Sequence, residues 1–445
     1  MAFELLSKVA AGLLRKDPLP AERIGEAFAE ALHARLALAA GALDAESIGK
    51  PGGPYREENY REALAHLQEY FPKAADRLRR ERLDGAVLTE ELRRQPQVRR
   101  KWLVRNMSRF RSYGLAERLL RLNWSLWHSD PREAENLSEV ILEIAEQLDE
   151  ILYGPFLLSD LRARALCHLA NSRRLLRHLR SVEETFQAAE FYLDRGSGDP
   201  AERASFLLLK AYLRHDERRL DEANEFLDEA ARIYQAQGNL RQEATVLLKK
   251  ASLLQDSARN EEALEILRQV SALTQGHESQ LYFFAYHNIT DLLALMGRTE
   301  EALDRIQAGQ ELAMEAGGAI DRLKVDWLAG RLLADVDRLD RAQEVLETAK
   351  ASFLEQEMGF EAVCVALDLA EVYLRSERRK DAEGLIFELP AYLRSSRVAP
   401  SVFEALHLLQ QRLREGSASA KLVREVADFL DVAGVDPSAV FTPSN

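Results

Sequence analysis

Histidine, cysteine and acidic side chains are the groups through which this chain could catalyse a reaction or hold a metal ion. No two of its nine histidines stand four residues apart, the spacing that places two imidazoles on one face of a helix. Glu278 follows His277, but Leu281 stands where a zinc-protease motif needs its second histidine. The glycine-rich phosphate loop and the serine nucleophile motif are also missing. The sequence therefore predicts no metal and no cofactor.

The two cysteines, Cys167 and Cys364, are too few for a disulfide framework or a cysteine zinc site. Cys167 precedes His168, but consecutive residues on a helix point about 100° apart, so adjacency does not pair a thiol with a base. Two buried thiols suit a reducing compartment, which favours the cytoplasm. Residues 196–200, GSGDP, are typical of a turn with proline at the first position of the next helix. Catalytic residues are therefore not predicted, and the chain is expected not to be an enzyme.

Arginine and lysine are concentrated in one window of an acidic chain. The net charge is −13, yet residues 77–111 hold twelve basic and four acidic residues, a net of +8. One interpretation is a basic docking patch for an acidic protein or a phosphate backbone. The other is a solvated helix face, or arginines paired with acidic helices that follow, such as residues 133–150. The acidic total disfavours nucleic acid. The residues of this basic patch are Arg93, Arg94, Arg99, Arg100, Lys101 and Arg105.

The composition is that of a folded, non-membrane protein. The 445 residues are 47% hydrophobic and 30% charged, and no run of 18 uncharged apolar residues occurs. Glu4 and Lys8 interrupt the apolar stretch at the start, which does not have the pattern of a signal peptide. No membrane partner is expected.

A repeat of about 40 residues organises the chain. Proline is absent from residues 201–389, where apolar residues recur at helical spacing, so helices joined by short turns are predicted. Segments such as RLDEANEFLDEA, RNEEALEILRQV and RLDRAQEVLETA align with one another. A small residue, here called the anchor, recurs every 39 to 41 residues. The anchors are Val182, Ala223, Ala263, Ala302, Ala342 and Ala382, and an earlier one at Ala134 precedes a longer connection.

The residue types around each anchor also repeat. The residue twelve positions earlier is small, and the one four positions later is large and apolar. Two antiparallel helices approach closely only where small side chains face each other, so the small pair predicts a helical hairpin. One hairpin cannot bury both faces, and neighbours must stack. Glycines near the end of each second helix, such as Gly196, Gly238, Gly276, Gly317 and Gly359, are expected to adopt the left-handed conformation.

This pattern resembles the tetratricopeptide repeat (TPR) family, in its longer-helix form from bacterial regulatory and peptide-sensing proteins. The resemblance covers residues 113–415, about seven repeats, and implies an all-α solenoid. Val182 and Thr290 depart from it, because smaller residues are usual at their positions, and the frequent proline after the second helix is missing. Some similar proteins carry a zinc-binding segment near the start, but no cysteine precedes Cys167, so that feature is not carried over.

The repeat also predicts three parts of the chain. Residues 1–112 lie outside the 40-residue pattern and form a helical cap or output arm, with a break at residues 48–54. Residues 113–415 form the solenoid. Residues 416–445 supply a final amphipathic helix that covers the last repeat, followed by a loose tail.

The first helices are expected to line a concave groove. The residues fifteen, eleven and eight positions before each anchor then form what we call the groove row, and LYFFAYHN adds four aromatics on one first helix. Whether these aromatics face the groove or pack internally is left open. The candidate partner-binding residues are Asn171, Arg174, Tyr212, His215, Tyr282, Phe284, His287, Asp291, Trp327, Arg331 and Glu371.

The favoured function is a non-enzymatic scaffold that captures a protein or peptide segment in this groove. The alternative is a peptide-responsive receptor whose residues 1–112 restrain a transcription or sigma factor. A third class is a component of a bacterial stress or defence pathway controlled by a protease. The identity of the partner and the oligomeric state are left open by the sequence.

Overall fold

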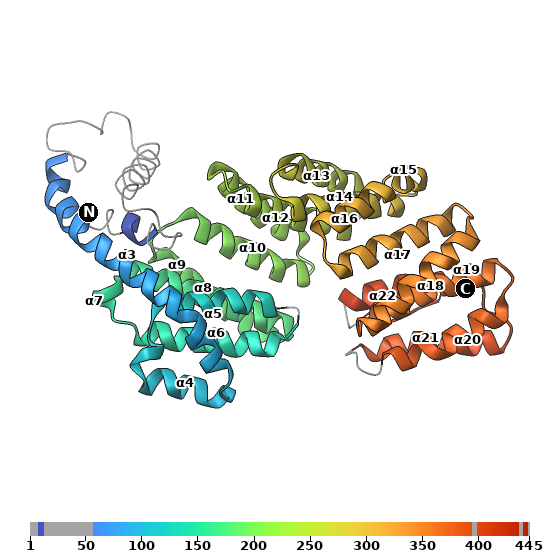
Figure 1. Ribbon diagram of the computed structural model, residues 1–445, viewed down its shortest axis with the longest axis horizontal. Helices are drawn as coiled ribbons and strands as arrows, with labels where there is room; N and C mark the ends of the chain where they lie inside the picture. The colour runs from blue at the N-terminus through green and yellow to red at the C-terminus, as the bar shows by residue number, and fades with distance from the viewer. Residues whose placement is uncertain (1–7, 13–56, 128, 394–397, 436–438, 444–445) are drawn as a thin grey trace. The chain divides into compact units, whose positions relative to one another are not determined.

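The structure is a computed structural model that describes residues 8–12, 57–127, 129–393, 398–435 and 439–443. Those residues form helices joined by short turns, with no strand among them (Figure 1). The all-α solenoid predicted from the sequence is confirmed at the level of the helical hairpins described below. The predicted break at residues 48–54 lies outside the described residues.

The chain divides into two compact units, Met1–Asn239 and Leu240–Asn445. In the first unit a long helix precedes a series of helical hairpins, in which α5 packs on α6, α8 on α9 and α10 on α11. Its helices are α3 (Glu57–Arg93), α4 (Gln97–Asn106), α5 (Tyr113–Leu126), α6 (Pro131–Gln147), α7 (Glu150–Tyr153), α8 (Pro155–Leu175), α9 (Val182–Asp194), α10 (Pro200–Asp216) and α11 (Leu220–Ala236).

The second unit continues the same pattern of paired helices. Its helices are α12 (Leu240–Asp256), α13 (Asn260–Thr274), α14 (Ser279–Leu295), α15 (Thr299–Asp304), α16 (Ile306–Ala316), α17 (Ala319–Asp335), α18 (Leu339–Glu355), α19 (Gly359–Arg375), α20 (Arg379–Tyr392), α21 (Pro400–Arg414) and α22 (Ala420–Val435). In the repeats, α8, α10, α12, α14, α17 and α19 are the first helices. The following helix of each hairpin is the second helix, and α15 and α16 together form one.

The anchors occupy equivalent places, as the repeat predicts. Each lies in the first turns of a second helix and is fully buried, from Val182 in α9 to Ala382 in α20. At Gly330, twelve residues before an anchor, an added Cβ would lie 2.6 Å from Leu346 Cδ2 on the second helix. Small residues at this position therefore allow the two helices of a hairpin to touch, and the large residue of the second helix fills that contact.

Left-handed backbone occurs at the turns, but mostly not at the glycines that the sequence suggests. Gly238 and Gly276 do have positive φ, of 64° and 76°. Gly317 has φ −90° and Gly359 begins α19, so the expectation is wrong for these two. Gly196 is required for a close approach instead, because an added Cβ would lie 2.0 Å from Asp160 Oδ1.

One second helix is broken, and it belongs to the repeat with an unusual residue at the small position. The helix stops at Asp304 and restarts at Ile306 as α16. Between them Arg305 turns inward, where its Nε donates to Thr290 Oγ1 at 3.1 Å and its guanidinium lies 3.9 Å from the Tyr286 ring centroid. Thr290 stands where other repeats have alanine or glycine, and its hydroxyl gives the inserted arginine a partner.

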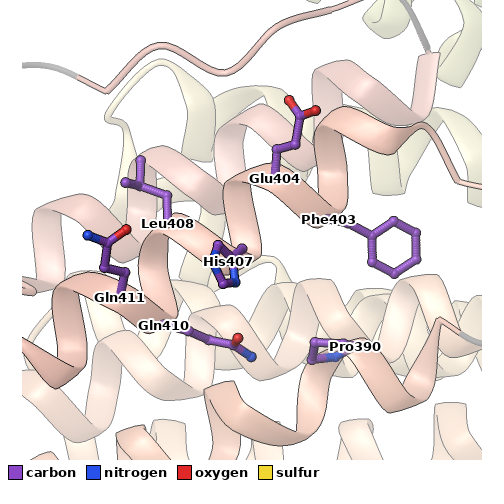
Figure 2. A pocket seen from close by; sticks show the side chains of 7 residues that line it. All are labelled: Pro390, Phe403, Glu404, His407, Leu408, Gln410 and Gln411. Carbon is purple, nitrogen blue, oxygen red and sulfur yellow. The ribbon is translucent and has the colours of Figure 1, made fainter.

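The last second helix, α20, contains a proline that its neighbour compensates. Pro390 has no N–H to donate to the carbonyl of Ile386 four residues earlier. Gln410 Nε2 on α21 donates to that carbonyl at 3.1 Å. Figure 2 shows Gln410 and Pro390 on the two facing helices, and together with Phe403 and His407 they line a pocket of about 540 Å³.

Helix α3, from the region before the repeats, packs closely on α5. An added Cβ on Gly114 would lie 2.3 Å from the carbonyl carbon of Glu81, so these two backbones touch. Arg82 Nε donates to Glu117 at 2.7 Å, and Tyr153 O–H donates to Glu81 at 2.7 Å. The predicted boundaries at residues 112 and 415 do not coincide with the division into two units and stay predictions.

Candidate functional site

Groove-row residues of neighbouring first helices contact one another in the first unit. Arg174 on α8 donates to Asn171 Oδ1 at 3.0 Å and to Asp216 Oδ2 on α10 at 2.6 Å. Its guanidinium lies 5.5 Å from the ring centroid of Tyr212. His215 Nδ1 lies 3.8 Å from the carboxylate of Asp216. Four predicted residues from two repeats therefore form one cluster, with Asp216 as a member that the sequence analysis did not select.

Burial and charge set the ionisation of this cluster. Burial opposes ionisation of Asp216, but hydrogen bonds from His215 and Arg174 and the charge of Arg174 outweigh it and lower the pKa of Asp216. Burial raises the pKa of the Tyr212 hydroxyl. Asn171 is 1% exposed, so it contacts the other residues of the cluster from the protein interior and is not accessible to solvent. These contacts hold the charged and aromatic side chains of the cluster in fixed positions.

A second set of groove-row residues meets in the other unit. Arg331 Nη1 on α17 lies 3.9 Å from Asp291 Oδ1 on α14, and these side chains are 31% and 50% exposed. Burial lowers the pKa of His287, on the same face as Asp291. Asp291 and Arg331 are accessible to a partner, because both keep much of their surface in contact with solvent.

Trp327 is held by contacts with the core. Its indole Nε1 donates to Asp368 Oδ2 on α19 at 2.6 Å, and its ring meets Phe353 edge to face at 6.2 Å between centroids. Burial raises the pKa of Asp368 to about 6. Trp327 therefore presents only part of its ring, and the buried carboxyl fixes the orientation of that ring.

Helix α22 covers the end of this second row. It packs more extensively on α19 than on its hairpin partner α21. Arg424 of α22 donates to Glu371 at 2.6 Å and to Asp335 of α17 at 3.1 Å. Glu371 was predicted to be a partner-binding groove residue. In the structure, the chain's own last helix occupies its carboxylate.

The aromatic run on α14 divides between two sides of the helix. Phe283 is buried and packs with Ala313 and Val325, and Phe284 is half-buried against the same cluster. Tyr282 lines a different pocket of about 530 Å³ with Tyr286 and residues of α13. Since Tyr282 and His287 are five residues apart, they point about 140° apart on a helix. The prediction of Tyr282 in the same groove as His287 is therefore wrong.

Acidic residues of α6 neutralise half of the basic patch. Arg100 donates to Glu133 at 2.6 Å, Lys101 to Glu139 at 2.5 Å, and Arg105 to Glu143 at 2.7 Å. Arg100 is 5% exposed, so it is part of the interior. Arg93 pairs with Glu90, while Arg94 and Arg99 are exposed on the surface. Internal pairing, one of the two interpretations of this window, accounts for these contacts.

The described residues contain no group of three histidine, cysteine or acidic residues that could hold a metal ion. Within the same residues, no helix is long and apolar enough to cross a membrane. Cys167 and Cys364 are buried and are not joined by a disulfide, and burial raises the pKa of the Cys167 thiol.

Comparisons with known proteins support the fold. No family model matches the sequence, and no curated protein matches it. A Rap protein solved in complex with competence and sporulation factor is similar over 72% of this chain and 87% of that chain, at 16% identity and a TM-score of 0.51.

Two other solved structures have lower scores. One contains the kinesin light chain TPR-like repeats of Podosopora anserina (17% identity, 44% of this chain, 97% of that chain, TM-score 0.38). The other is NprR with its cognate peptide NprX (14% identity, 71% of this chain, 88% of that chain, TM-score 0.42). The likeness to the Rap protein shows the fold alone. Together with the equivalent anchors it confirms the TPR-like repeat.

Proposed function

We propose that this protein is a non-enzymatic, regulatory scaffold that holds a protein or peptide segment against the groove rows of its first helices. The observation that carries this proposal is the contact between groove-row residues of neighbouring repeats, Arg174 with Tyr212 and Arg331 with Asp291. A segment lying across two first helices would meet one continuous polar and aromatic surface. The Rap protein of similar fold was solved with competence and sporulation factor, which supports a factor bound by the repeats as the class of partner.

The coupling of α3 to the hairpins supports the receptor form of this function. The Gly114 contact and the Arg82–Glu117 ion pair fix α3 against α5. A change in the packing of the first hairpin would therefore move α3 as well. We propose residues 1–112 as the output region of such a receptor, with a cytoplasmic location.

The test exchanges the charges of one exposed pair. Asp291→Arg combined with Arg331→Asp keeps an ion pair in the groove row. A ligand would then meet a positive charge at position 291 and a negative charge at position 331. We expect loss of the partner that unmodified protein captures from the native host, with an unchanged thermal midpoint. The matched control is Glu265→Arg on second helix α13, at a side chain that is 78% exposed. Retained capture by the exchanged pair, or equal loss in the control, would reject the groove.

A further inference from the structure

A hydrogen-bonded asparagine lies at the centre of an aromatic cluster between α5 and α8. Asn123 is fully buried near the end of α5. Its Nδ2 donates to Ser138 Oγ at 2.8 Å and to the carbonyl of Ala134. Its Oδ1 accepts from Trp127 Nε1 at 2.8 Å and lies 3.0 Å from His168 Nδ1 on α8. All four hydrogen-bonding positions of this amide are therefore used, and the amide cannot be flipped without losing them.

These bonds assign the proton of His168. Oδ1 of Asn123 can only accept, so Nδ1 of His168 must donate, and Nε2 is left as a bare acceptor. Burial, followed by the charge of Arg164, lowers the pKa of His168 to about 3, so the ring is neutral at pH 7. In the part of the chain that the structure describes, Nε2 has no hydrogen-bonding partner.

Two tryptophans lie next to this acceptor, and one of them is exposed. The ring centroids of Trp124 and Trp127 are 4.4 Å apart, and those of Trp127 and His168 are 5.1 Å apart. Trp127 is 4% exposed, whereas Trp124 is 47% exposed. The surface therefore exposes part of the Trp124 indole, which lies beside a second indole and has its ring centroid 6.2 Å from that of the neutral His168 imidazole.

An indole face attracts cations because its π electrons carry negative charge, and a neutral imidazole nitrogen accepts hydrogen bonds. A guanidinium group satisfies both, since it is planar, stacks on aromatic faces and donates in its own plane. The nearby cation Arg164 is half-buried, donates to the Tyr113 hydroxyl oxygen at 2.6 Å and lies 3.7 Å from Glu202. The chain's net charge of −13 also favours a basic partner.

We propose that Trp124, Trp127 and His168 form a binding point for an arginine side chain of the partner. This inference rests on the proposed function for the identity of the ligand as a protein segment. It adds the requirement that the partner carries an arginine. It also adds a binding position on α5 and α8, outside the residues selected from the sequence. Lysine would fit less well, because its ammonium cannot stack as a plane.

The chain's four tryptophans make a direct test possible. Full-length protein labelled with 5-fluorotryptophan gives one fluorine NMR signal for each of Trp102, Trp124, Trp127 and Trp327, assigned by single Trp→Phe variants. Arginine methyl ester is titrated in, with citrulline methyl ester as the uncharged probe of nearly the same shape. We expect saturating shifts at Trp124 and Trp127 with the arginine ester, and none with the citrulline ester.

Trp102 provides the matched control, because it is also exposed, at 54%, but lies on a different helix, α4. Trp124→Ala should abolish the arginine-dependent shift at Trp127, and Trp102→Ala should leave it unchanged. Equal shifts at Trp102, or equal responses to citrulline, would overturn the proposal. The free probe reports on this site whether or not the groove rows bind a partner, so failure here is distinguishable from failure of the charge-exchange test.

Discussion

The residue that closes each first helix adopts a left-handed conformation. It stands five positions before the anchor in every repeat, with φ between 56° and 74°. Only one of these residues is glycine, so most repeats retain a conformation that side chains disfavour. The six residues are Arg177, Arg218, Ala258, Gly297, Asp337 and Glu377.

Exchanging residue types at this turn should change stability in opposite directions. Ala258→Gly removes the clash of Cβ with the backbone, and we expect stabilisation by about 0.5 to 1 kcal/mol. Gly297→Ala should destabilise by a similar amount, although nothing lies within 4 Å of the added Cβ. Urea denaturation of the two variants measures both effects. A shift of both midpoints in the same direction would show that backbone strain is not the cause.

The buried carboxyl of Asp368 makes stability depend on pH. Its pKa is raised from 3.8 to about 6, first by burial, so the folded protein keeps this proton where the unfolded chain has lost it. Stability is therefore greatest below the unfolded pKa and falls as pH rises from about 4 to 6. Asp368→Asn keeps an acceptor for Trp327. We expect this variant to gain stability over wild type by about 3 kcal/mol at pH 7. A constant difference between pH 4 and 7 would contradict the assignment.

Among the helices, α20 and α21 show how a local irregularity is corrected by a neighbour. Gln410→Met has a similar shape but leaves the buried carbonyl of Ile386 without its donor. We expect a loss of about 1 to 3 kcal/mol. Gln411→Met is the matched control, because Gln411 is exposed and donates only to Glu415. Thermal denaturation compares them, and equal losses would mean that the Ile386 bond does not stabilise the proline-containing helix.

The helix pairs could be predicted from the sequence because small and large residues recur at fixed positions around each anchor. The face of the helix on which an individual side chain makes its contacts could not be predicted from the sequence. Tyr282 and His287 both lie on a first helix, but only contacts with α13 and α17 decide their faces. The cover of α22 over Glu371 depends on a contact between residues 53 positions apart, for which no periodic signal exists.

The Asn123 cluster was missed for a related reason. Its members come from α5 and α8, and Trp124, Trp127 and His168 lie outside the groove row of any repeat. The signal available was the pair of tryptophans three residues apart at the end of α5. The neighbour of His168 in sequence, Cys167, points elsewhere on the helix, and the hydrogen-bonding partner of His168 is an amide on another helix.

For the whole molecule, charge is the property that connects sequence to partner. The basic window 77–111 is largely paired within the chain, notably with Glu133, Glu139 and Glu143, and each pair neutralises one acidic and one basic charge. The net charge of the sequence stays at −13. An acidic surface with polar and aromatic groove rows favours a basic protein segment over a nucleic acid.

Site-specific photocrosslinking tests most directly whether first helices hold the partner. A benzoylphenylalanine residue is placed at Ser252 or Asp291, half-exposed groove-row positions, and at Glu265, an exposed position of second helix α13. After irradiation of the native host, we predict a covalent adduct of one discrete size from positions 252 and 291, and none from 265. An adduct from 265 alone would contradict the account, as would the absence of adducts at both groove-row positions while the intact protein still captures its partner.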